Sequence, residues 1–181
     1  MADRTDKDWV CSKEHTLGKE FHLTEVIILL GSNIDKEKNI PQTVTVLHNH
    51  SDLVVCAVSA IYESMALNSA GEEDATLPAF HNAAVLVETT LEPVAVRAVL
   101  RQIEAELGRV RTDDKFAPRP IDLDIIFYGQ SILTAEEAGS PIPDPDSLSH
   151  AHIAIPVAEI APDWQHPETG LSLQKIAAQV R

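Results

Sequence analysis

The stretch from Val26 to Asn33, VIILLGSN, decides the fold class, because it is an apolar run that ends in a turn-forming triplet. Such a run indicates a buried strand followed by a turn. A helix is expected next, with Pro41 in its first turn. The apolar side of this helix is formed, at helical spacing, by Ile40, Val44 and Leu47.

Beyond this stretch the chain alternates between apolar runs and polar loops. Further strands are predicted at Leu53 to Tyr62, Asn82 to Thr89 and Ile121 to Tyr128, with Ser131 to Leu133 as a short partner of the last. Helices are predicted from Pro93 to about Leu107, near Ile155 to Ile160 and near Leu173 to Val180. Long loops are expected at 63–81, 108–120 and 134–149; loops of this length inside a compact domain are usually functional or disordered.

The order β-α-β-β-α-β is that of a ferredoxin-like sandwich, an α+β fold with helices on one face of an antiparallel sheet. With 181 residues and 44% hydrophobic content, the chain can bury a full core. Residues 1–22 are polar and mixed in charge, so we expect an N-terminal extension with weak order. Residues 23–181 are expected to form a single domain that ends in a C-terminal extension of the sandwich.

The formal charge of −14 argues against a nucleic-acid or anionic-membrane surface. Its distribution says more, because every Lys and Arg between Lys38 and Lys175 lies within residues 97–119. This stretch has a net charge of +2, whereas the remainder of the chain carries −16. A lone basic island on an acidic protein suits a small polyanion.

Cysteine usage and hydropathy predict a cytoplasmic protein. Cys11 and Cys56 lie far apart, and no disulfide framework or CxxC zinc motif is present. The first 22 residues lack an apolar core of the signal-peptide kind, and no run approaches the roughly 18 apolar residues of a membrane span. The sequence leaves open whether the protein is a monomer or a homodimer.

The sharpest local feature is the pair Asp122 and Asp124 in the last predicted strand. Alternate side chains of a strand share a face, so both carboxylates should point one way and Leu123 the other. Paired carboxylates without an adjacent base suit a hard cation such as Mg²⁺, especially beside nucleotide phosphates. The alternative is a strand with one solvated face.

Four basic residues precede this pair on the predicted loop, and they could clamp phosphate oxygens: Arg109, Arg111, Lys115 and Arg119. Alternatively, they form solvated ion pairs with neighbouring acids. Together with the Asp pair they would provide the phosphate-binding groups and the metal ligands that phosphoryl transfer requires. The chain has neither GxxxxGK[ST] nor GxGxxG, so a nucleotide would be held without these loops.

Two further groups could bind a ligand. Asn82 could read a heterocycle with its amide while Phe80 stacks on the ring, although such an Asn more often closes a turn. His150 and His152 alternate and could ligate a metal, although such a pair on a loop is more often solvated.

The run from Lys115 to Ile126, KFAPRPIDLDII, closely resembles the signature of the 6-hydroxymethyl-7,8-dihydropterin pyrophosphokinases of folate biosynthesis. Other segments are similar to the same family in the same order: GSN at 31–33, FHNAA at 80–84, GRVR at 108–111, YG at 128–129 and AEIAP at 158–162. The resemblance implies a ferredoxin-like fold. It also implies an enzyme that transfers pyrophosphate from ATP to the pterin hydroxymethyl group, with two Mg²⁺ and release of AMP.

The resemblance implies a role for each matching residue. Asp122 and Asp124 would hold the metal ions, and the loop residues Arg109, Lys115 and Arg119 would engage the triphosphate as catalytic groups. Residues at the nucleotide would be Glu104, Arg111, Arg119 and Ile125. Residues lining the pterin pocket would be Leu67, Phe80, Asn82 and Phe116. The implied partners are these small molecules, with no nucleic acid and no membrane.

The sequence departs from the family pattern after Tyr128. Asp144 stands where a nucleotide-binding His is expected, His150 near an expected Arg, and His152 near an expected pterin-stacking Phe. Two alternatives to the pyrophosphokinase therefore remain. One is a divergent member that binds a pterin-like ligand with lost or altered use of ATP, and the other is a different Asp-dependent metal phosphoesterase.

Overall fold

The computed structural model describes residues 22–66, 68, 72–111 and 117–180. Its strands form one antiparallel sheet in the order β2-β4-β1-β5, and β3 also pairs with β4. The strands are β1 (Thr24–Ser32), β2 (Val54–Val58), β3 (Tyr62–Ser64), β4 (Phe80–Thr89) and β5 (Asp122–Tyr128). The helices are α1 (Lys36–His48), α2 (Pro93–Glu106), α3 (Ala135–Ala138), the 3-10 turn η1 (Pro145–Leu148), α4 (Ala151–Ile160) and α5 (Leu173–Gln179).

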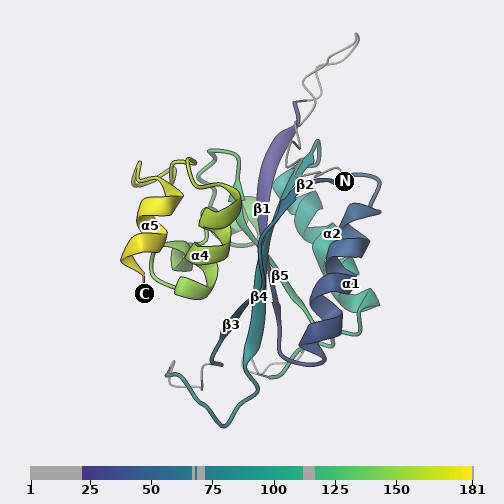
Figure 1. The fold of residues 1–181 in the computed structure, drawn as a ribbon. Coiled ribbons are helices and arrows are strands. Elements are labelled where there is room, and N and C mark those ends of the chain that lie inside the picture. The colour runs from purple at the N-terminus through teal and green to yellow at the C-terminus, as the bar shows by residue number, and fades with distance from the viewer. Residues whose placement is uncertain (1–21, 67, 69–71, 112–116, 181) are drawn as a thin grey trace, which may run out of the picture.

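The prediction of an antiparallel sheet with helices packed on it is confirmed, but helices cover both of its faces. Figure 1 shows the sheet edge-on, with α1 and α2 on one side and α4 and α5 on the other. Val26, Ile28 and Leu30 pack toward α1 and α2, whereas Ile27 and Leu29 pack toward α4 and α5. The expectation of helices on one face was therefore wrong: β1 is apolar on both faces, and both need cover.

The second predicted strand is interrupted. β2 ends at Val58, and β3 begins at Tyr62 and runs to Ser64, inside the predicted loop. Between them, the Ser59 side chain accepts the main-chain N–H of Ala84 at 2.9 Å and takes the place of a ladder bond. A side chain that competes with the ladder in this way ends regular pairing.

Two helices begin earlier than predicted. α1 begins at Lys36, so that Pro41 lies inside it, because the carbonyl of Asp35 accepts the first helical bonds from Lys38 and Asn39, each at 2.9 Å. α4 begins at Ala151, because the carbonyl of His150 accepts from Ile153 and Ala154 at 3.1 and 3.0 Å. His150 and His152 thus lie at the start of a helix instead of on a loop.

The predicted loop 134–149 also contains structure. α3 begins with a capping box in which Thr134 and Glu137 satisfy each other's main chain, and η1 follows. The predicted strand at 131–133 is reduced to one bridge between Leu133 and Ile142.

A bulge in the pairing of β1 with β5 sets the orientation of the β5 side chains. Ile28 pairs with Ile125 and Ile27 with Phe127, so one β5 residue is extra at this point. Ile125 therefore packs toward α1 and α2, while Ile126 and Phe127 both pack toward α4 and α5. N-terminal to the bulge the alternation is regular, which keeps Asp122 and Asp124 on one face.

Residues 1–21, most of the predicted extension, lie outside the described residues. Within the described part of the chain, none of the helices combines the length and the apolar character that crossing a membrane requires.

Replacing Phe127 by Ala should lower the free energy of unfolding by about 3–5 kcal/mol, because it opens a cavity in the layer between the sheet and the C-terminal helices. Phe127 is 1% exposed, and its ring meets Trp164 and His166 edge-on at 6.4 and 5.5 Å. Urea unfolding followed by circular dichroism would measure the change. Val110→Ala, at a residue 81% exposed, is the control and should change stability by less than about 0.5 kcal/mol. Equal effects of the two substitutions would contradict the packing role of Phe127.

Candidate active site

Three strands bring their polar ends together at one point of the sheet. Gly31 of β1 is opposite Asn82 of β4 on one side and Asp122 of β5 on the other. Directly opposed residues of antiparallel strands point to the same face, so all three face α4. They line a cavity of about 220 Å³ together with Leu29, Ser64, Met65, Ala66, Phe80, Arg119, Asp124 and His152.

Gly31 lines the cavity between its two neighbours in the sheet, Asn82 and Asp122. A Cβ atom at this position would lie 3.6 Å from Asn82 Oδ1, 3.8 Å from Phe80 Cδ1 and 3.9 Å from the Cβ of Asp122. The missing side chain therefore leaves open the space that connects the amide and the aromatic ring with the carboxylates.

The predicted orientation of the Asp pair is confirmed. Asp122 and Asp124 line the cavity, whereas Ile121, Leu123 and Ile125 are buried in the core on the opposite face. Ile125, which the resemblance places at the nucleotide, thus directs its side chain away from the cavity.

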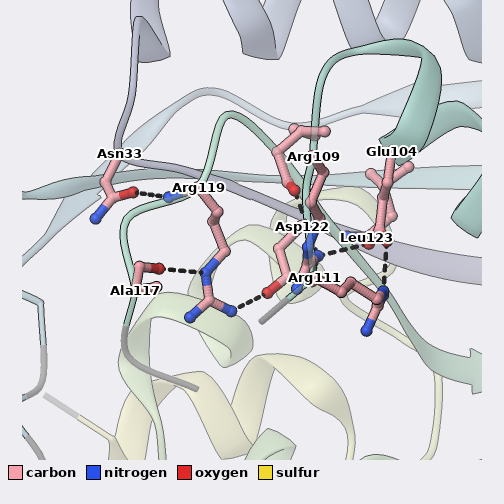
Figure 2. Close-up of polar contacts among 9 residues, drawn as sticks. Asn33, Glu104, Arg109, Arg111, Ala117, Arg119, Asp122 and Leu123 are labelled. Atoms are coloured by element: carbon pink, nitrogen blue, oxygen red, sulfur yellow. Dashed lines mark hydrogen bonds and ion pairs between the residues drawn. The ribbon is translucent and has the colours of Figure 1, made fainter. Parts of the chain in front are cut away.

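Asp122 is neutralised by two arginines, as Figure 2 shows. Arg109 Nη1 donates to its Oδ1, and Arg119 Nη1 donates to its Oδ2 at 2.5 Å. Burial by itself would raise the pKa of Asp122, but the hydrogen bonds and charges of Arg109 and Arg119 outweigh burial and hold the pKa below its usual range.

Asp124 has the opposite environment. It forms no ion pair within the described part of the chain. Its side chain is still exposed to solvent. The protein atoms packed around the cavity partly desolvate it, and the charges of Asp122, Asp144 and Glu104 add to this effect; together they raise the pKa of Asp124 to about 7. A carboxylate in this position favours a positive ligand.

Glu104 joins the arginine loop to the sheet. Its side chain is 1% exposed; Oε1 accepts from Arg109 at 2.7 Å and from the Leu123 N–H at 2.9 Å, and Oε2 accepts from Arg111 at 2.6 Å. Both carboxylate oxygens of Glu104 therefore accept hydrogen bonds from the protein. Glu104 is not among the described residues that line the cavity, and it holds Arg109 in place (Figure 2). The resemblance places Glu104 at the nucleotide, but in this structure its hydrogen bonds are with the loop arginines and with the main chain of β5.

Asn33 is a site residue that sequence reasoning missed, because its triplet was judged an ordinary strand-to-helix turn. Its Oδ1 accepts the Arg119 N–H at 2.7 Å, its own N–H donates to the Arg119 carbonyl at 3.2 Å, and its Nδ2 donates to the Pro78 carbonyl at 3.4 Å. Asn33 therefore holds the main chain of Arg119 in place and connects it to the segment before β4.

The aromatic and amide groups predicted for a heterocycle both line the cavity. Asn82 is 3% exposed, and the Phe80 ring lies beneath the Arg119 guanidinium, with 5.9 Å from Cζ to the ring centroid. The remaining predicted site residues, Leu67, Lys115 and Phe116, lie outside the described residues.

The departures from the family pattern lie close to this site. His152 lines the cavity, and its ring contacts that of His150 with 5.4 Å between centroids. Burial, with the neighbouring His150, lowers the pKa of His152, so the ring favours its neutral form. Asp144 donates its main-chain N–H to Ile126 at 3.0 Å, and burial raises its pKa.

The arrangement places a carboxylate pair, two arginines, an amide and an aromatic ring around one cavity. Among the residues that the structure describes, no cluster of three or more His, Cys, Asp or Glu could hold a metal by itself. The donor set is therefore two carboxylates, which is typical of Mg²⁺ bound jointly with substrate phosphates.

Comparison with known proteins agrees with this geometry. Residues 27–162 match the model of the 7,8-dihydro-6-hydroxymethylpterin-pyrophosphokinase family. A 2-amino-4-hydroxy-6-hydroxymethyldihydropteridine pyrophosphokinase of Bacillus subtilis is 34% identical over 154 residues, covering 84% of this chain and 87% of the relative. The enzyme of the same name from Pseudomonas aeruginosa is 30% identical over 147 residues, covering 81% and 86%.

Other relatives are much longer proteins. A folic acid synthesis protein of Pneumocystis carinii is 37% identical over 148 residues, which cover 82% of this chain but only 19% of that protein. The crystal structure of wild-type Plasmodium falciparum HPPK-DHPS with pteroate superposes on 90% of this chain and 43% of its own, with a TM-score of 0.65 and 14% identity. At this identity the likeness shows the fold alone.

The family match spans most of the chain, and it includes β1, β4, β5 and the cavity that they form. The two bacterial relatives match over nearly their whole length. The chain therefore belongs to the 7,8-dihydro-6-hydroxymethylpterin-pyrophosphokinase family.

Proposed function

We propose that this protein transfers pyrophosphate from ATP to the hydroxymethyl group of 6-hydroxymethyl-7,8-dihydropterin, in folate biosynthesis. The observation that carries the proposal is the continuity of the cavity across Gly31. On one side lie Phe80 and Asn82, which suit a flat polar heterocycle, and on the other lie Asp122 and Asp124, which suit a metal-bound polyphosphate.

The carboxylates fit the two Mg²⁺ that the family resemblance implies. Asp122 and Asp124 share one strand face, and partial desolvation, followed by the negative charges of Asp122, Asp144 and Glu104, raises the pKa of Asp124. A cation bound at this carboxylate would offset both effects. Bound here with ATP, the ions would neutralise phosphate charge and help to orient the β-phosphate.

Arg109 and Arg119 are proposed as the phosphate-binding groups, with Lys115 as a third. In the free protein both arginines are occupied by Asp122. Once that carboxylate is neutralised otherwise, the two guanidinium groups become available to the triphosphate, where they stabilise the charge of the transition state. Glu104 would act mainly by holding Arg109 and Arg111 toward the nucleotide.

The reaction is proposed as a direct in-line transfer. The pterin hydroxyl oxygen forms a bond to the β-phosphorus and gives up its proton to solvent. The bond from the β-phosphorus to the bridging oxygen of the α-phosphate breaks, and its electron pair leaves with AMP. Asn82 and Phe80 would position the pterin, together with Leu67 and Phe116. Proximity and orientation supply much of the rate enhancement in this mechanism.

A second candidate is a pterin-binding protein with weakened use of ATP. One observation favours it: Asp144 adds negative charge around Asp124, at the position where the family resemblance leads us to expect a nucleotide-binding His. Pterin binding without ATP binding in calorimetry would support this candidate over the first.

The direct test is AMP formation from ATP, Mg²⁺ and the hydroxymethyl dihydropterin. We expect AMP only when all components are present, and a loss of at least about 100-fold in Asp122→Ala, because several kcal/mol of charge stabilisation disappear with the carboxylate. Circular dichroism should show an intact fold in the variant. Absence of AMP at high concentrations of the wild-type protein would refute the proposed function, and normal turnover in the variant would refute the role of Asp122.

Enlarging Gly31 should block the pterin half of the cavity. Gly31→Ala introduces only ordinary van der Waals contacts of 3.6–3.9 Å and should fold normally. Gly31→Val adds two further methyl groups in a strand that accepts β-branched residues. We expect pterin affinity to fall from the wild type to Gly31→Ala and further to Gly31→Val, by more than about tenfold for Val. The reason is that the added methyl groups occupy the space that the pterin would fill. Calorimetry would measure it; unchanged affinity in Gly31→Val would place the pterin elsewhere.

Asp124 should make the metal-free protein less stable as the pH rises. Its folded pKa of about 7 lies above the ordinary value of 3.8, so the folded state holds the proton more tightly, and this contribution to stability is lost as the pH rises from 3.8 through about 7. Asp124→Asn removes this dependence. Its thermal midpoint in EDTA should therefore exceed that of the wild type by more at pH 8 than at pH 5. A constant difference between the two proteins at both pH values would show that Asp124 titrates normally.

A further inference from the structure

The amide of Asn82 has one chemically allowed orientation. Its Nδ2 donates to Ser64 Oγ at 2.9 Å and to the Tyr62 main-chain carbonyl at 3.3 Å. A carbonyl oxygen only accepts hydrogen bonds, so the flipped amide would place two oxygens against each other. Both N–H groups of Asn82 are therefore used by β3.

The oxygen of the same amide faces the cavity. Asn82 Oδ1 is the nearest atom to a Cβ built on Gly31, at 3.6 Å, and both residues line the cavity. A bound heterocycle thus meets a hydrogen-bond acceptor at this point. An acceptor favours a ring edge that presents an N–H and disfavours one that presents an oxygen lone pair.

β3 itself is anchored by α4. Glu159 Oε2 accepts the Tyr62 hydroxyl at 2.9 Å and the Ala60 main-chain N–H at 3.0 Å. The hydrogen bond to Glu159, with some burial, raises the pKa of Tyr62, which keeps the hydroxyl protonated as a donor. Because β3 has three residues and pairs with β4, this attachment fixes the position of the Tyr62 carbonyl.

We propose that Ser64 and Glu159 are positioning residues that hold the Asn82 oxygen toward the cavity, and that this orientation makes the site select a heterocycle with an N–H at that point. The inference rests on the proposed function, since a pterin offers such an edge through its 2-amino group. Ser64 acts on the amide directly, and Glu159 acts through the Tyr62 carbonyl. Without the Ser64 hydroxyl, one amide N–H loses its partner and the flipped orientation becomes more accessible.

The test compares binding of 6-hydroxymethylpterin with that of 6-hydroxymethyllumazine, which carries an oxygen in place of the 2-amino group. The wild type should prefer the pterin. Ser64→Ala should reduce this preference by about 3- to 10-fold, the range that corresponds to one hydrogen bond. Ser64→Thr, which restores a hydroxyl, should recover it. Glu159→Ala should reduce the preference as well, and Glu159→Gln, which keeps an accepting oxygen, should retain most of it.

Glu63→Gln is the matched control on the same strand. Its side chain reaches the opposite face, where it pairs with Lys36 at 2.7 Å, so the preference should equal that of the wild type. Affinity for ATP, measured separately, should be the same in all variants. An unchanged preference in Ser64→Ala, or an equal loss in Glu63→Gln, would overturn the inference while leaving the proposed function intact. A wild type that binds neither compound would instead remove the proposed function and this inference with it.

Discussion

The buried carboxylate of Glu104 is the constraint on which the site depends. It comes from α2, yet its oxygens receive donors from the loop arginines Arg109 and Arg111 and from the main chain of Leu123 in β5. One side chain thus fixes the distance between a helix, a loop and a strand, and places Arg109 against Asp122. A charge buried to this degree is tolerated because each oxygen is satisfied, and removing one partner of such a pair typically costs about 3–5 kcal/mol.

The two carboxylates of the cavity, Asp122 and Asp124, have opposite electrostatic environments. Asp122 has two arginine partners, which hold its pKa below the usual range, whereas partial desolvation and the neighbouring carboxylates raise the pKa of Asp124. A site of this kind is incomplete without a ligand that carries both cations and anions, because cations suit Asp124 and anions suit the arginines. A metal–triphosphate complex has this character. The overall charge of −14 is consistent with it, since the basic residues are concentrated where the polyphosphate would lie.

Local patterns predicted the parts of the structure that depend on neighbours in sequence. The alternation of Asp122, Leu123 and Asp124 predicted the shared face of the carboxylates, and the apolar run of β1 predicted a buried strand. The role of Asn33 was not predictable in this way, because its partner Arg119 is distant in sequence and meets it only in the folded sheet. The same reason explains Ser64, which lay in a predicted loop and binds Asn82 from the adjacent strand. The cover of the second sheet face by α4 and α5 likewise depends on how the C-terminal segment folds back.

The spacing of the strands on either side of Gly31 favours direct transfer of the pyrophosphate from ATP to the pterin. Asn82 and Asp122 flank Gly31 on its two neighbouring strands, and adjacent strands are about 4.8 Å apart. A heterocycle at the amide and a polyphosphate at the carboxylates therefore occupy adjoining parts of one cavity, with no side chain between them. Reactants held this closely gain their rate from orientation, without a protein nucleophile to carry the group between two separate sites. The absent side chain of Gly31 is thus as much a part of the proposed mechanism as the charged groups around it.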